Sequence, residues 1–124
     1  NAWMGATVDC QDRVKATEDA FSKMSGGTKW LSLEPLLNPL KFERLDLFDW
    51  IVIGGSSAST QGIQTIEWRP DFNWIIDLHL QARQAKCKVY HKSNMYERVK
   101  EFPWIESKEK KLPDCFKYLP SLKQ

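Results

Sequence analysis

The sequence predicts an α/β fold with a four-stranded, mainly parallel sheet, because short apolar segments of strand type alternate with segments of helical periodicity. This alternation favours parallel strands joined by right-handed crossovers. The 124-residue length fits one domain, and 42% hydrophobic residues are enough for a core. We expect residues 1–94 to form the β/α units, with Asn1 and Ala2 as a tag remnant, and residues 95–124 to form an irregular charged tail that packs on the sheet or extends it.

The first β/α unit begins with residues 3–8 (WMGATV), which are typical of a short buried strand. Asp9 is then expected to cap a helix, with a role as a ligand as the alternative. Apolar side chains at spacings of three and four predict one buried helix face, formed by Val14, Thr17, Phe21 and Met24. The two glycines at 26 and 27 should end this helix.

Residues 29–34 (KWLSLE) predict the second strand, and two prolines predict a loop with at most one helical turn over residues 35–48. Residues 49–55 (DWIVIGG) give the clearest strand. They are apolar on both faces, which is typical of a parallel sheet covered by helices. The loop from Gly54 to Arg69 is unusually long, which indicates a function or mobility.

The last unit contains a helix with Pro70 in its first turn and a fourth strand at residues 87–92 (CKVYHK). The inward stripe of this helix is expected to comprise Phe72, Ile75, Ile76, His79 and Leu80. Four strands cannot close a (β/α)₈ barrel, which takes about 250 residues. The open edges are therefore expected to be covered by the tail, by a second copy of the chain in a homodimer, or by a missing amino-terminal half.

Polar groups follow all four expected strands. In parallel α/β folds ligands bind at the carboxyl ends of the strands. We therefore expect a ligand site at this rim, with candidates Asp9, Glu34, Gly54, Gly55, Ser56, Arg69, His91 and Lys92. No catalytic residue can be assigned among them, since no Ser-His-Asp or Cys-His pairing is evident.

Two of these candidates leave alternatives open. Glu34 could accept hydrogen bonds from a ribose or an amine, or it could form a structural salt bridge to Lys92 or Arg69. The backbone of the Gly54-Gly55-Ser56 turn could bind a phosphate or carboxylate. Because adjacent strand residues point to opposite faces, only one of His91 and Lys92 can face the site, and we favour Lys92. His79 is expected to be a core histidine.

Several classes of protein are disfavoured. Cys10, Cys87 and Cys115 are scattered without a CxxC pair, so we expect no metal site, no disulfide framework and a reducing cytoplasm. No apolar run approaches the roughly 20 residues of a membrane span. A net charge of +2 is too balanced to indicate a membrane surface or nucleic acid, and only the basic segment 108–111 keeps nucleic acid as a minor alternative.

Several motifs resemble those of a phage-associated protein family of unknown function. Residues 31–37 (LSLEPLL) and 49–55 (DWIVIGG) match the motifs LSLEPLL and DWVIVGG, and residues 3–8 resemble a WLGVSVE strand. Arg69-Pro70 together with residues 89–92 (VYHK) resembles RP…FFFKQWG. The resemblance runs over about residues 3 to 95, the carboxyl-terminal half of that family, which is itself similar to radical-SAM enzymes and spore photoproduct lyases.

The resemblance implies half of a TIM-like barrel. In the full-length protein, an amino-terminal cysteine motif would bind a [4Fe–4S] cluster and S-adenosylmethionine would lie across the strand ends, facing Glu34 and the Gly54-Gly55-Ser56 turn. This chain lacks the cysteine motif, carries Ser56 in place of the usual glutamate, and is expected to be an inactive fragment without cofactor. The alternative is a self-contained binding or assembly module that dimerises and binds an anionic ligand at the loop from Gly54 to Arg69.

Overall fold

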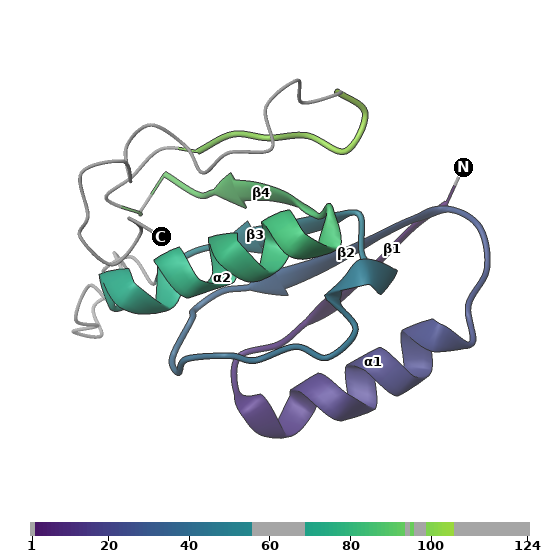
Figure 1. Ribbon diagram of the computed structural model, residues 1–124, viewed down its shortest axis with the longest axis horizontal. Helices are drawn as coiled ribbons and strands as arrows, with labels where there is room; N and C mark the ends of the chain where they lie inside the picture. Colours follow the sequence, from purple (N-terminus) through teal and green to yellow (C-terminus); the bar gives the residue numbers. More distant parts are fainter. Residues whose placement is uncertain (1, 56–68, 94, 96–98, 106–124) are drawn as a thin grey trace, which may run out of the picture.

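The computed structural model describes residues 2–55, 69–93, 95 and 99–105 (Figure 1). Its helices and strands are β1 (Trp3–Thr7), α1 (Val14–Ser22), β2 (Thr28–Leu33), β3 (Trp50–Ile53), α2 (Phe72–Ala85) and β4 (Lys88–His91), with short 3-10 turns η1 (Gln11–Arg13) and η2 (Leu45–Leu47). The sheet order is β1-β2-β3-β4, and every neighbouring pair is parallel. The α/β fold with a four-stranded parallel sheet is therefore confirmed, as is the single helical turn in the second loop.

Both helices cover the same face of the sheet (Figure 1). Alternate residues along the strands point to this face and form the core with side chains from both helices and from η2. The core residues in or directly after the strands are Val8, Leu31, Leu33, Ile51, Ile53 and Val89. The expectation that both faces of β3 lie under helices is wrong for the described residues. Each crossover leads to the next strand on the same side, so the other face, which we call the helix-free face, carries no helix of the described residues.

The start of the first helical segment differs from the prediction. Asp9 caps neither η1 nor α1, because Cys10 adopts an extended backbone before η1 and occupies the cap position. The Oδ1 atom of Asp9 instead lies 3.5 Å from Nε of Arg13. Because η1 begins one residue later than the prediction requires, the side chain of Asp9 does not stand at its cap position.

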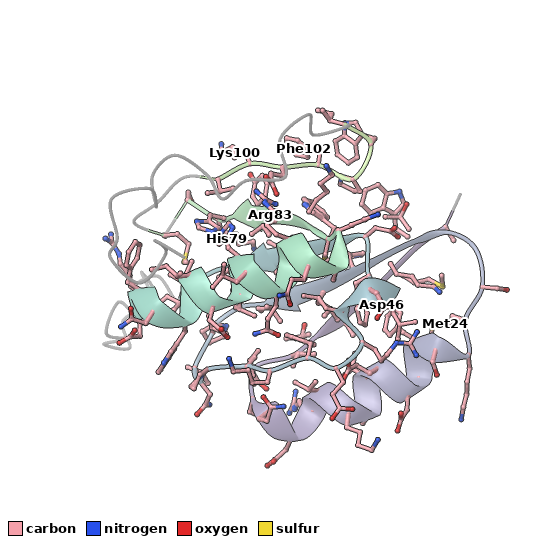
Figure 2. All side chains as sticks on the ribbon, viewed as in Figure 1. Met24, Asp46, His79, Arg83, Lys100 and Phe102 are labelled. Carbon is pink, nitrogen blue, oxygen red and sulfur yellow. The ribbon has the colours of Figure 1, made fainter. Side chains whose placement is uncertain are left out.

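The buried face of α1 was predicted correctly at Val14 and Phe21. Met24 is exposed, because the helix ends before it (Figure 2). Glu18 is buried in a position that the apolar spacing did not indicate, and its carboxylate accepts a hydrogen bond from the backbone N–H of Arg44. This bond satisfies the charged group, which is why a carboxylate is tolerated there.

The second helix also starts later than predicted, so Pro70 precedes it. Asp71 is the cap, and its Oδ1 accepts a 2.8 Å hydrogen bond from the backbone N–H of Asn73. Ile75, Ile76 and His79 are buried as predicted, whereas Leu80 is 42% exposed and Leu78 is buried in its place.

Replacing Asp71 with alanine is expected to lower the free energy of unfolding by about 1 kcal/mol, because one of the first N–H groups of α2 loses its acceptor. Asp71→Asn keeps an acceptor oxygen and should recover most of this loss. Urea unfolding of the two variants measures the difference. Equal destabilisation by both would show that the cap contributes through charge alone.

Residues 99–105, which we call the edge segment, run antiparallel beside β4. The N–H of His91 donates to the carbonyl of Val99 (2.6 Å), and the N–H of Glu101 donates to the carbonyl of Val89 (3.0 Å). Tyr90 and Lys100 form an antiparallel bridge. This part of the tail therefore covers one edge of the sheet; residues 106–124 and most of the loop from Gly54 to Arg69 lie outside the described residues.

Neither α1 nor α2 is long and apolar enough to cross a membrane, and the described residues contain no longer helix.

Candidate functional site

The carboxyl ends of the four strands lie side by side. The strand register aligns Thr7 with Ser32, Ser32 with Val52, and Val52 with Tyr90. Residues two positions further on share the same level and the same face, because side chains alternate along each strand. These are Asp9, Glu34, Gly54 and Lys92. Glu34, Gly54 and Lys92 therefore lie together at one rim of the parallel sheet, on the face without helices.

An ion pair spans the central strand at this rim. Nζ of Lys92, after β4, lies 2.6 Å from Oε2 of Glu34, after β2. Gly54 lies between them, and a Cβ atom built there would come within 3.0 Å of Cγ of Glu34. Glycine at this position leaves room for the glutamate side chain to cross β3. The structure thus contains the salt bridge to Lys92 that was one of the two interpretations of Glu34, and both side chains are still partly exposed.

The other rim candidates are placed differently. Asp9 lies beside Glu34 in register but has its ion-pair contact with Arg13. His91 is buried on the helix-covered face, away from Lys92, as the alternation of strand side chains predicts. Gly55 is buried and Arg69 is half-buried, whereas Ser56 lies outside the described residues.

Two buried histidines meet between α2 and β4. Nε2 of His79 lies 2.8 Å from Nε2 of His91, so one ring donates a hydrogen bond to the other. Burial, together with smaller effects of the nearby His91 and Arg83, lowers the pKa of His79 to about 2. The prediction of a core histidine at position 79 is confirmed. Its partner was missed, because the sequence does not show which helix residue faces which strand residue.

The face without helices carries an aromatic cluster that none of the sequence motifs indicated. Its ring centroids lie 4.8–6.4 Å apart, and its members are Trp3, Trp30, Trp50, Tyr90, Phe102 and Trp104. Trp50 is central and donates from Nε1 to the carbonyl of Glu101 (2.8 Å). The Trp30 ring lies directly over Gly5, where a Cβ atom would be only 2.3 Å from it.

A hollow of about 360 Å³ opens in this cluster. It is lined by Trp30, Ser32, Trp50, Val52, Tyr90, Lys92 and Phe102. The lining strand residues belong to the same face as Glu34 and Gly54, so the hollow and the rim ion pair are continuous. The alternation Trp30, Ser32, Glu34 and the matching pair Tyr90, Lys92 are the sequence signal that could have revealed it.

The described residues contain no group of three His, Cys, Asp or Glu side chains that could hold a metal ion. Cys10 follows β1 and Cys87 precedes β4, so the two thiols lie at opposite ends of a parallel sheet. Burial raises the pKa of the Cys87 thiol. Thiolate is the form that binds iron or zinc, so Cys87 is a poor ligand.

A family model described as a protein of unknown function, DUF5131, matches residues 1–111. No curated protein and no solved structure matches the chain. The family match includes every rim residue and the whole aromatic cluster.

Proposed function

We propose that this chain, which belongs to the DUF5131 family of proteins of unknown function, supplies part of the wall and rim of a radical-SAM-like partial barrel, where it binds the polar head of S-adenosylmethionine. The observation that carries the proposal is the Glu34–Lys92 ion pair across Gly54 on the helix-free face. The links of the chain to phage proteins and to radical-SAM enzymes rest on the sequence motifs.

The winding of the sheet supports the barrel part of the proposal. Strands that follow one another in sequence order, with all helices on one side, are arranged as in the wall of a (β/α) barrel. Doubly wound folds place helices on both faces. In a barrel the helix-free face would be the interior, so Glu34 and Lys92 would point toward a ligand at its mouth.

The rim pair supports the ligand part. A carboxylate and an ammonium 2.6 Å apart suit a zwitterionic α-amino acid head, whose ammonium would bind Glu34 and whose carboxylate would bind Lys92. Each group has spare capacity, since a carboxylate has about four lone-pair sites and an ammonium three donors. S-adenosylmethionine ends in such a head.

The described residues fit this head but not an iron–sulfur cluster. Cluster ligation takes several closely placed thiolates, and here Cys10 and Cys87 are separated. S-adenosylmethionine together with a cluster supplies radical chemistry. The described part of this chain would contribute binding and orientation.

Calorimetric titration of the 124-residue chain with S-adenosylmethionine tests the rim. Glu34→Gln should weaken binding about tenfold or more, because a charge-assisted hydrogen bond becomes a neutral one. Glu43→Gln is the matched control: Glu43 is exposed on the loop before η2, on the helix side, and its replacement should change nothing. Unchanged binding in Glu34→Gln, or no binding by the unmodified chain, would make the ion pair purely structural.

The alternative of a self-contained module that binds an anion at the loop from Gly54 to Arg69 depends mainly on residues 56–68, which lie outside the described residues.

A further inference from the structure

We infer that the hollow on the helix-free face is a nucleotide site, in which the base stacks on the aromatic side chains and the phosphate binds Lys100. This site is distinct from the amino acid head of the proposed function: Lys92 borders both, but the stacking rings and Lys100 take no part in the rim pair.

The shape of the hollow argues for a ligand. Protein interiors are close-packed, so an aromatic cluster with a purely structural role should fill the space between its rings. Here about 360 Å³ stays open, which is within the size range of small-molecule sites, about 300–1,000 Å³. The two helices of the described residues cover the opposite face of the sheet (Figure 1).

The lining argues for a planar heteroaromatic ring. Trp30, Trp50, Tyr90 and Phe102 supply the aromatic surfaces on which a base can stack. The Ser32 hydroxyl and Lys92 are the polar groups of the lining and can bond to ring nitrogens or exocyclic groups. Few polar groups in a mainly apolar wall are typical of sites that hold a flat ring in one orientation.

The charges next to the hollow argue for a phosphate. Lys100 pairs with Tyr90 in the antiparallel bridge, so both side chains lie on the helix-free face, and Nζ of Lys100 is 6.0 Å from the Tyr90 ring centroid. Figure 2 shows Lys100 and Phe102 together on the edge segment. Lys92 is already paired with Glu34, so we assign the phosphate of a base-stacked nucleotide to Lys100.

Tryptophan fluorescence provides the assay, because Trp30 and Trp50 both line the hollow. The 124-residue chain is titrated with AMP, adenosine and ribose 5-phosphate. AMP should quench the fluorescence and bind at least tenfold more tightly than ribose 5-phosphate. Lys100→Met should lower the affinity for AMP several-fold and leave the affinity for adenosine unchanged. A hexamer of deoxyadenylate shows whether the natural ligand is a free nucleotide or a single-stranded nucleic acid. An affinity a hundredfold higher than that of AMP, with strong salt dependence, assigns the site to single-stranded nucleic acid. An affinity no higher than that of AMP assigns it to free nucleotides.

Filling variants test the location. Ser32→Phe and Val52→Phe each place a ring into the hollow and should reduce AMP affinity at least tenfold; two variants are used because either could impair folding, which thermal unfolding detects. Trp104→Ala is the matched control, since Trp104 belongs to the aromatic cluster but does not line the hollow. Lys100→Met should leave S-adenosylmethionine binding unchanged, which separates this site from the rim. Absence of AMP binding at millimolar concentration, retention of affinity in a folded filling variant, or an equal loss in Trp104→Ala would overturn the inference.

Discussion

Replacing Glu101 with alanine is expected to destabilise the protein by about 2–4 kcal/mol, the largest effect of any single charged residue described above. Its carboxylate binds both terminal nitrogens of Arg83, with Oε1–Nη1 and Oε2–Nη2 distances of 2.8 and 2.5 Å. Oε1 also accepts the N–H of Val89 (2.9 Å), and the backbone of Glu101 bonds to Val89 and Trp50. One residue thus joins α2, β3, β4 and the edge segment.

The size of the effect follows from burial. The side chains of Arg83 and Glu101 are 15% and 19% exposed, so removing the carboxylate leaves a guanidinium that water reaches poorly. Burial alone would raise the pKa of Glu101, but the hydrogen bonds from Arg83 and Val89 outweigh it and lower the pKa. The carboxylate is therefore ionised near neutral pH and its charge is part of the contact.

Chemical denaturation of Glu101→Ala measures the loss, and Asp46→Ala supplies the comparison. Asp46 forms a similar two-bond pair with Arg44, but both side chains are 55% exposed. Solvent screens that pair, so its removal should destabilise the protein far less than the removal of Glu101 does. Similar losses for the two variants would contradict the importance of burial.

Acidification is expected to destabilise the protein through the His79–His91 pair. The pKa of His79 is about 2 in the folded protein and its ordinary value is 6.5, so below pH 6.5 the unfolded chain binds a proton that the folded chain does not. Stability is then present above pH 6.5 and falls with decreasing pH by up to about 1.4 kcal/mol per pH unit. Between pH 6.5 and 4.5 we expect a loss of about 2 kcal/mol from this group.

The double variant His79→Leu/His91→Leu isolates this contribution. It removes both imidazoles together, so neither ring is left buried without the other. Urea midpoints are measured for both proteins across the pH range, and carboxylate titration cancels in the difference. If the stability of the double variant falls as steeply between pH 6.5 and 4.5 as that of the unmodified chain, the histidine pair is not responsible.

The fold was largely predictable because apolar periodicity and turn residues determine strands and helices locally. Residues 49–55 could be recognised as a strand from their composition, and the strand ends differ from the prediction by no more than two residues. The errors at Asp9 and Pro70 concern the residue at which a helix begins, and the error at Leu80 concerns which side of α2 faces the core. Both features change when a helix starts one residue earlier or later. Glu18 was missed for another reason: its backbone partner, Arg44, is 26 residues away in the sequence.

The sequence predicted which residues meet at the rim of the sheet, but not the hollow on the face of the sheet beside them. Parallel strands bring Glu34 and Lys92 to one rim in any such sheet, and the alternation of side chains correctly separated Lys92 from His91. The hollow depends on both crossovers passing on the same side and on the edge segment returning past β4 with Phe102. Neither event has a local sequence signal.

The edge segment covers one edge of the four-stranded sheet and leaves the edge at β1 open in the described residues. The outward N–H groups of Val89 and His91 are occupied, one by the Glu101 carboxylate and the other by the Val99 carbonyl. At the opposite margin, no strand of the described residues lies beyond β1. A further strand, whether from more of the same polypeptide or from another molecule, can therefore pair directly with the four-stranded sheet alongside Trp3–Thr7, whereas direct pairing with β4 requires the contacts of Glu101 and Val99 to break first.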